Sequence, residues 1–237
     1  ADIQVLRNLN QAELIGSIDE MVRMIRNSQI IMIPGGFSGG DEPDGSAKFI
    51  TAVFRNPAVR EAVEDLLANR DGLMLGVCNG FQALIKLGLV PFGTITEPDK
   101  ANPTLTYNRI GRHASCLVRT RIASVKSPWL ANTDIDDIHT VPVSHGEGRF
   151  IASEEIIRRL IENGQIATQY VDLNGKPSME AAYNPNESTL AIEGITSPDG
   201  RVFGKMAHSE RIGRNLYRNV PGNTDQKIFE AGVAYFR

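Results

Sequence analysis

The chain has 237 residues, of which 41% are hydrophobic and 22% charged, a composition typical of a globular chain with one sizeable core. Its net charge of -3 gives no reason to expect nucleic acid or an anionic membrane surface as a partner. No apolar run reaches the ~20 residues that cross a bilayer. The two cysteines, Cys78 and Cys116, are too few for a disulfide framework, which favours a cytoplasmic location.

The first third of the chain alternates strands and helices. A strand-like run at 3–6 comes almost at once, and the chain starts without methionine, so we expect a piece of something longer. Apolar positions at helical spacing predict a helix over 11–27, followed by a buried strand at 30–33 and a glycine-rich loop. Two helices over 46–69 should separate near Asn56-Pro57, because proline suits a first helical turn. A strand at 72–77 and a helix at 80–87 complete a pattern typical of doubly wound α/β proteins.

After Pro91 the sequence becomes rich in strand patterns separated by turn signals. Strands are predicted in HASCLVRTRIASV, DIHTVPVSH, GQIATQYVD, LAIEGITS and RVFGKMAHSE, and the last two flank residues 197–200 as a hairpin. Helices are predicted at 153–162 and near 225–235. The sequence therefore predicts one α/β domain over residues 1–237, with a flavodoxin-like, mostly parallel sheet to which the second half adds antiparallel strands.

The segment GVCNG, residues 76–80, lies where a strand passes into a helix, as in a nucleophile elbow. Glycines flank the central residue because side chains there would collide with neighbouring backbone. The turn exposes Cys78 at the carboxyl edge of the sheet and at a helix N-terminus, which favours thiolate. It also aims the backbone N–H of Asn79 at an oxyanion. A buried structural cysteine fits the same five residues equally well, and for Cys116, inside a strand, that interpretation is preferred.

A cysteine nucleophile in acyl transfer needs a base and a group that orients the base. His208 ends a predicted strand, and in an extended segment Glu210, two residues later, would share its face. A solvated surface pair is the alternative interpretation. His145, in VSHGEGRF, indicates a loop or strand end close to a ligand, whereas His113 and His139 have no such neighbours. No cluster of histidine, cysteine and carboxylate residues has the spacing of metal ligands.

The loop IPGGFSGGD follows a strand as a phosphate-binding loop would. It lacks the lysine and Ser/Thr of a Walker A motif and does not match Gly-x-Gly-x-x-Gly, so it indicates phosphate binding only weakly. A second oxyanion donor, the backbone of Gly35 or Gly36, fits better, because a separate loop commonly supplies that donor.

Four segments, in chain order, resemble the class I (triad-type) glutamine amidotransferases: PGGFSGGDEPDG, GVCNGFQALIKLGLVP, VPVSHGEGRF and SPDGRVFGKMAHSER. Within that group they look like the glutaminase domains of phosphoribosylformylglycinamidine synthase, the fourth step of purine biosynthesis. The CNGFQ and HGEGR segments are the most specific, and the resemblance covers nearly the whole chain. It implies that Cys78 is the nucleophile, His208 the general base and acid, and Glu210 the carboxylate that orients His208.

The same resemblance implies the remaining site residues. Backbone N–H groups of Gly36 and Asn79 would form the oxyanion hole. The substrate-binding residues implied by the family's motifs are Gly35, Gln82, His145, Gly146, Glu147 and Gly148.

The resemblance implies hydrolysis of L-glutamine through a γ-glutamyl thioester. The ammonia would pass to a phosphoribosylformylglycinamidine synthetase domain or subunit, which converts formylglycinamide ribonucleotide to formylglycinamidine ribonucleotide. No cofactor is expected in this chain, since ATP and Mg²⁺ belong to the synthetase site, and neither nucleic acid nor membrane is an expected partner.

Two departures from the family's pattern stand out. The family usually has His-Pro-Glu where this chain has His208, Ser209 and Glu210; both functional side chains remain, while a rigid backbone unit is lost. The chain also begins at the family's second strand, and the family's first strand and loop are not seen in it. We expect the C-terminal part of a longer chain, while truncation, disorder and a strand from another chain stay open. Two other functions stay open: an amidotransferase that serves a different synthase, and a non-enzymatic redox or stress-related protein with a cysteine elbow. Gln82 and the pair of His208 and Glu210 argue against the second, because a sensor thiol needs neither, and SHGEGRF argues more weakly against the first.

Overall fold

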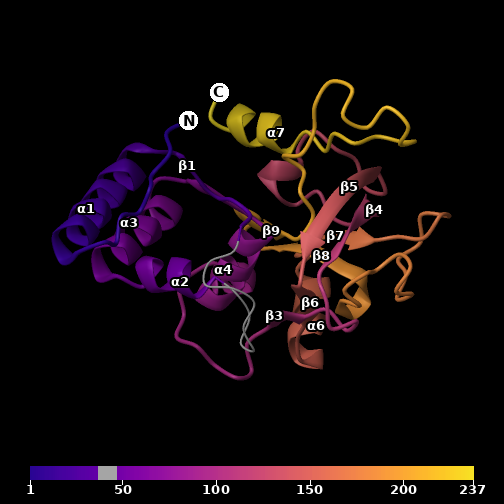
Figure 1. Ribbon diagram of the computed structural model, residues 1–237, viewed down its shortest axis with the longest axis horizontal. Helices are drawn as coiled ribbons and strands as arrows, with labels where there is room; N and C mark the ends of the chain where they lie inside the picture. The colour runs from indigo at the N-terminus through magenta and orange to yellow at the C-terminus, as the bar shows by residue number, and fades with distance from the viewer. Residues whose placement is uncertain (37–46) are drawn as a thin grey trace.

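A mixed sheet forms the centre of the molecule (Figure 1). In the computed structural model, which describes residues 1–36 and 47–237, the larger sheet has seven strands in the order β1-β2-β9-β8-β7-β4-β5. They are β1 (Ile30–Ile33), β2 (Leu73–Val77), β9 (Val202–Lys205), β8 (Ile192–Thr196), β7 (Ile166–Tyr170), β4 (Ala114–Ile122) and β5 (Ile138–His145). A smaller sheet pairs β3 (Thr104–Tyr107) with β6 (Glu147–Ile151). The α/β class predicted from the sequence is confirmed.

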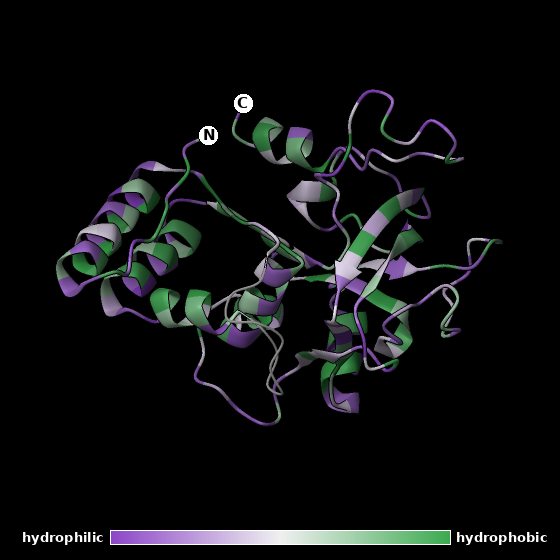
Figure 2. Ribbon diagram, in the orientation of Figure 1, coloured by the Kyte–Doolittle hydropathy of each residue, from purple (hydrophilic) through white to green (hydrophobic). Residues whose placement is uncertain are grey.

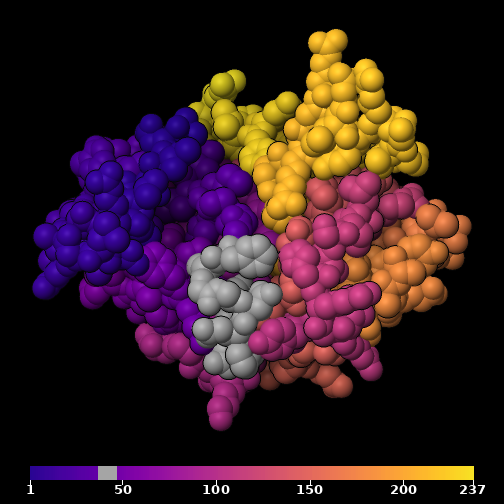
Figure 3. All heavy atoms as spheres, in the orientation of Figure 1, coloured from indigo at the N-terminus to yellow at the C-terminus, as the bar shows by residue number. Residues whose placement is uncertain are grey.

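The two halves of the chain build different parts of the large sheet. Strands β1, β2 and β9 run parallel, whereas β8, β7, β4 and β5 pair antiparallel. In Figure 1 helices α1 (Gln11–Asn27), α2 (Lys48–Phe54) and α3 (Pro57–Ala68) lie on the left of the molecule, and the antiparallel strands β8, β7, β4 and β5 lie on its right. Figure 3 shows the same division on the molecular surface, with violet N-terminal and magenta-to-yellow C-terminal parts side by side.

Capping side chains fix the start of helices α1 and α3. Helix α1 (Gln11–Asn27) starts after Asn10, whose side chain accepts a hydrogen bond from the backbone of Glu13 at 2.9 Å. Helix α3 (Pro57–Ala68) has a proline in its first turn and is capped by Asn56. The remaining helices are α2 (Lys48–Phe54), α4 (Asn79–Leu87), α5 (Leu89–Phe92), α6 (Glu154–Glu162) and α7 (Ile228–Ala234). None of the helices in the described ranges is long and apolar enough to cross a membrane.

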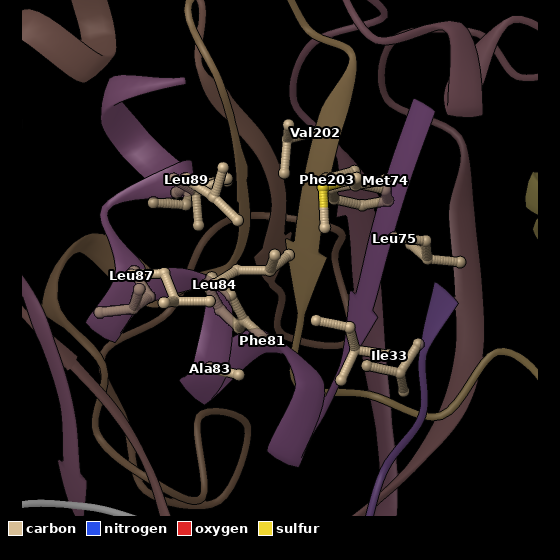
Figure 4. Close-up of a cluster of buried hydrophobic side chains, with 14 of the residues drawn as sticks. Ile33, Met74, Leu75, Phe81, Ala83, Leu84, Leu87, Leu89, Val202 and Phe203 are labelled. Atoms are coloured by element: carbon tan, nitrogen blue, oxygen red, sulfur yellow. The ribbon is translucent and has the colours of Figure 1, made fainter. Parts of the chain in front are cut away.

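The main core lies around the parallel strands. All five residues of β2 are buried, as expected for a strand covered on both faces. Figure 4 shows side chains from β1, β2, α4 and β9 meeting in one cluster, among them Ile33, Leu75, Phe81 and Phe203. Figure 2 shows hydrophobic and hydrophilic residues mixed along helices such as α1 and α3, as in helices with one apolar face. The core therefore fixes β2 and α4, the two elements on either side of Cys78.

The predicted elements match the structure, with one exception. Helices at 11–27, 46–69 and 153–162, strands at 30–33 and 72–77, and the hairpin around 197–200 are confirmed. The run at 3–6 forms no strand: Ile3 is 88% exposed and Val5 66%, and no described strand pairs with them. β-Propensity alone does not make a strand, because the backbone groups of an isolated segment stay hydrogen-bonded to water.

Candidate active site

Cys78 sits in a strained turn between β2 and α4. It is the residue before the first turn of the helix, and its backbone adopts φ 52° and ψ -106°. A positive φ is unfavourable for a residue with a Cβ and is maintained only where the surroundings determine the conformation. The side chain is 6% exposed. The structure therefore contains the sharp strand-to-helix turn that Gly-x-Cys-x-Gly predicts.

The flanking glycines let three backbone segments meet at this turn. A Cβ on Gly76 would lie 2.7 Å from the carbonyl carbon and oxygen of Gly80. A Cβ on Gly80 would overlap the carbonyl oxygen of Ile33 in β1. Because backbone cannot move aside as a flexible side chain can, both positions exclude a larger residue. The glycines bring the helix start against the two parallel strands and leave Cys78 projecting from the turn.

Cys78 and His208 follow the ends of adjacent parallel strands. Val77 in β2 is the register partner of Lys205 in β9, and the Cys78 backbone N–H donates to the Lys205 carbonyl at 2.8 Å. Gly35, after β1, contacts both side chains: a Cβ built there would lie 2.8 Å from His208 Cε1 and 3.4 Å from Cys78 Cβ. The carboxyl ends of β1, β2 and β9 thus bring the predicted nucleophile and base together, at the sheet edge where α/β proteins bind ligands.

The His208 imidazole is held by Glu210. Its Nδ1 lies 2.6 Å from Glu210 Oε1, across a turn rather than along an extended segment, so the shared strand face expected from the sequence is not how the two residues meet. The carboxylate accepts the Nδ1 proton, which leaves Nε2 with its lone pair. Nε2 is buried and has no hydrogen-bond partner within the described residues. The imidazole can therefore receive a proton at Nε2 while Glu210 stabilises the resulting charge.

Glu210 stays ionised in this pairing. Burial raises the pKa of its carboxyl, but the hydrogen bond from His208, a backbone hydrogen bond and the charge of Lys205 together outweigh burial and lower the pKa below its ordinary value. A solvated surface pair does not describe this arrangement, because the His208 side chain is only 3% exposed.

We expect Gly35→Ala to reduce activity without unfolding the protein. The added methyl group would push the His208 ring away from Cys78, and a misplacement of about 1 Å can reduce turnover ~100-fold. The fold should persist because the atom contacted is in a side chain. Gly213→Ala is the control, since a Cβ there meets nothing within 4 Å. Steady-state kinetics with glutamine and a urea titration check both variants. Equal turnover by Gly35→Ala and Gly213→Ala would contradict this placement of His208.

The two predicted oxyanion donors are Asn79, within the elbow, and Gly36, which follows Gly35 after β1. Asn79 opens α4, so its backbone N–H belongs to the first turn, where helical N–H groups have no partner within the helix. Gly36 is exposed and adopts φ 155°, a conformation that favours glycine. The rest of the glycine-rich loop quoted above, residues 37–46, lies outside the described residues. The oxyanion roles of Gly36 and Asn79 stay predictions.

Gln82 connects the elbow helix to β6. It is 4% exposed, its Oε1 accepts from the Asn79 side chain at 2.9 Å, and its Nε2 donates to the Glu147 carbonyl at 2.6 Å. This chain of hydrogen bonds fastens the substrate-binding segment predicted at 145–148 to the helix that carries the nucleophile. The structure therefore gives Gln82 a positional role that the sequence did not suggest; substrate contact stays a prediction.

The segment from His145 to Gly148 joins the large sheet to the small one. His145 ends β5, Gly146 is the bend, and β6 begins at Glu147. All four residues are buried. A Cβ on Gly148 would lie 2.5 Å from His145 Cε1, so the imidazole packs directly against that glycine's backbone. This explains why position 148, three residues after His145, is a glycine.

Asn108 orients His145 and was missed in the sequence. Its Nδ2 donates to the backbone carbonyls of His145, at 2.7 Å, and Arg112, at 3.1 Å, which leaves Oδ1 as the acceptor 3.2 Å from His145 Nδ1. His145 therefore carries its proton on Nδ1 and presents Nε2 as a hydrogen-bond acceptor. An asparagine in the turn before β4 gives no sequence signal of this contact.

His145 is neutral at physiological pH. Burial, followed by the nearby imidazoles of His113 and His208, lowers its pKa to about 3. Because the unfolded state binds a proton at this position from about pH 6.5 down and the folded state does not, stability is lost as pH falls through that window. We expect the free energy of unfolding of His145→Gln to fall less steeply, by up to about 1.4 kcal/mol per pH unit. Urea titrations between about pH 7 and about pH 4 test this; parallel slopes would contradict it.

The other histidines differ in their distance from the site. His113 Nε2 lies 3.0 Å from the Ser144 hydroxyl, and the carbonyl of Ser144 is 3.7 Å from Cys78 Sγ, so this exposed histidine is close to the elbow although its sequence gave no indication. His139 is buried within β5, where burial lowers its pKa.

Cys116, in β4, is exposed and free. In the ranges 1–36 and 47–237 no three His, Cys, Asp or Glu residues are grouped so that they could hold a metal ion.

Comparisons with known proteins identify related chains. A family model described as the CobB/CobQ-like glutamine amidotransferase domain matches residues 4–236. The phosphoribosylformylglycinamidine synthase subunit PurQ of Aquifex aeolicus is 33% identical over 193 residues, which cover 81% of this chain and 77% of that protein. The PurQ subunit of Gloeobacter violaceus is 30% identical over 226 residues, covering 92% and 88%. The fold is similar to a chain in the structure of PurLQS from Thermotoga maritima, with a TM-score of 0.63, 24% identity, and coverage of 88% and 80%.

Proposed function

The chain belongs to the CobB/CobQ-like glutamine amidotransferase family, and from this premise we propose that it is the glutaminase of a phosphoribosylformylglycinamidine synthase. It hydrolyses L-glutamine and supplies ammonia to the ATP-dependent synthetase that makes formylglycinamidine ribonucleotide in purine biosynthesis. One observation carries the proposal: a strained cysteine and a carboxylate-bound histidine lie against the same glycine at the carboxyl edge of the sheet.

The reaction begins with proton transfer from Cys78 to His208. The Nε2 lone pair of His208 takes the thiol proton, and the thiolate attacks the carboxamide carbon of the glutamine side chain. Negative charge develops on the amide oxygen, which the backbone N–H groups of Asn79 and Gly36 stabilise. His208 then returns its proton to the departing nitrogen, so that the C–N bond breaks and ammonia leaves a γ-glutamyl thioester on Cys78.

Water completes the cycle. His208 accepts a proton from a water molecule that attacks the thioester carbonyl, the C–S bond breaks, and His208 returns the proton to the Cys78 sulfur as glutamate leaves. Glu210 holds the imidazole in the same tautomer for both steps and stabilises its positive charge. The buried segment 145–148, fixed by Gln82 and Asn108, binds the amino-acid end of glutamine.

The synthetase is the partner in this proposal. It holds ATP and Mg²⁺ and receives the ammonia, either as a domain of the same polypeptide or as a separate subunit. The relatives named PurQ are themselves subunits of such a synthase. We further propose that residues 1–237 form a glutaminase domain and that the enzyme works in the cytoplasm.

The proposal is tested by glutamate and ammonia release from L-glutamine, with the synthetase partner present. Wild-type protein should hydrolyse glutamine, His208→Ala should lose nearly all turnover, and Glu210→Gln should lose much of it, because an amide cannot stabilise the imidazolium charge. His139→Gln is the matched control, since it changes a buried histidine outside the site. Full turnover by His208→Ala would contradict the proposed base.

A further inference from the structure

A buried ion pair lies directly behind the residues described above. The Nζ of Lys205 in β9 and the Oε1 of Glu193 in β8 are 3.3 Å apart, and both side chains are fully buried. Two charges removed from water are costly unless every donor and acceptor is used. The sequence drew no attention to either residue.

Lys205 uses its ammonium to hold the residues on both sides of His208. Its Nζ donates to the Ala207 carbonyl at 2.8 Å and to the Ser209 hydroxyl at 2.8 Å. With Glu193 as the third partner, all three N–H groups of the ammonium are engaged. The Ser209 hydroxyl in turn donates to the side chain of Gln226.

Glu193 binds the same short segment before His208. Its Oε1 accepts from the backbone N–H of Ala207 at 2.6 Å, and its Oε2 accepts from the Thr168 hydroxyl at 2.5 Å. The two side chains of the pair therefore bind both the N–H and the carbonyl of Ala207. That residue immediately precedes His208.

Lys205 is also hydrogen-bonded to the backbone of the nucleophile, Cys78. The carbonyl of Lys205 accepts the N–H of Cys78, while the Lys205 side chain fixes the segment that carries His208. An apolar pair of similar volume would fill the space, but it could not bind the backbone groups of Ala207. We propose that Lys205 and Glu193 are positioning residues that set the His208 imidazole relative to Cys78. This inference rests on the proposed function, because it assumes that His208 is the base for Cys78.

The test combines kinetics with chemical labelling of Cys78. Lys205→Met removes the ammonium and keeps the length of the side chain, so the segment before His208 loses its anchor. We expect kcat for glutamine to fall ~100-fold with KM changed only slightly, because positioning of reacting groups is lost rather than substrate binding. The control Leu66→Ala, in the core of α3, should lower Tm as well yet keep the wild-type kcat.

Alkylation of Cys78 by iodoacetamide gives a readout that a purely structural role would not change. Its rate against pH reports the thiolate, and His208→Ala defines the profile of a cysteine without its base. Lys205→Met should follow the His208→Ala profile, whereas Leu66→Ala should follow the wild type. A wild-type profile and kcat for Lys205→Met would overturn the inference. If the wild type itself matched His208→Ala, the proposed base would fail, and the inference with it.

Ser209→Ala tests the same idea should Lys205→Met fail to fold. It removes one partner of the Lys205 ammonium and leaves the ion pair with Glu193 intact. We expect kcat to fall roughly tenfold and the alkylation profile to shift part of the way toward that of His208→Ala. Unchanged kcat and an unchanged profile in this variant would overturn the positioning role.

Discussion

Replacing Cys78 with glycine is expected to abolish glutamine hydrolysis and, at the same time, to make the protein more stable than Cys78→Ala. Both variants lack the thiolate, so neither can form the thioester. They differ in backbone strain: at φ 52° and ψ -106° alanine keeps the unfavourable contacts of a Cβ, whereas glycine has none. We expect an advantage of about 1 kcal/mol for glycine, after its greater freedom in the unfolded chain is subtracted.

Urea titrations of the two variants measure the difference, and ammonia release measures activity. The comparison separates two claims about one residue, since activity tests the nucleophile and stability tests the strained elbow. Glutamine hydrolysis by either variant would contradict the first claim. A glycine variant less stable than the alanine variant would contradict the second.

Gly80→Ala is expected to cause the largest loss of stability. The added Cβ overlaps the carbonyl oxygen of Ile33, and neither the strand nor the helix start can shift without disturbing the core around them. We expect a loss of about 3 kcal/mol or more, at the upper end of overpacking effects. Activity should fall with it, because the same displacement moves the turn that carries Cys78.

Gly16→Ala is the matched control for this prediction. Gly16 lies within helix α1, is exposed, and a Cβ there meets nothing within 4 Å. Alanine favours the helix by up to about 1 kcal/mol relative to glycine, so this variant should be slightly stabilised and fully active. Equal changes in Tm for the two substitutions would contradict the close packing of Gly80 against the Ile33 carbonyl.

The elements of this fold could be predicted from short-range pattern. Apolar spacing gave helix α1, a proline at a first turn separated α2 from α3, and a turn signal gave the hairpin of β8 and β9. The strand predicted at 3–6 is wrong, because whether an apolar run forms a strand depends on which strand lies beside it. Pattern along one segment does not contain that information.

The site was only partly predictable. The elbow has a sequence signature because its glycines are required by contacts within a few residues or with a neighbouring strand. Asn108, Lys205 and Glu193 have none, because each acts through contacts to residues distant in the chain or to backbone atoms. The substrate-binding roles predicted for Gln82 and 146–148 rest on resemblance alone, whereas His145 also had a signal in the residues around it. The structure adds the hydrogen bonds that hold these residues together.

Ser209 shows how the structure answers a question left by the sequence. A proline at this position would restrict the backbone between His208 and Glu210, and serine does not. The serine hydroxyl instead accepts a hydrogen bond from Lys205 and donates one to Gln226. Side-chain hydrogen bonds thus restrict a segment whose backbone is intrinsically freer.

The central claim is that Cys78 attacks the side chain of glutamine. The most direct measurement is covalent labelling with a glutamine-mimicking diazo-ketone, with the synthetase partner present, followed by mass spectrometry of the peptides. The account predicts one adduct at Cys78 that excess glutamine prevents and that is absent in Cys78→Ala, while the exposed Cys116 stays unmodified. Labelling at Cys116 in place of Cys78, or no labelling at all, would contradict it.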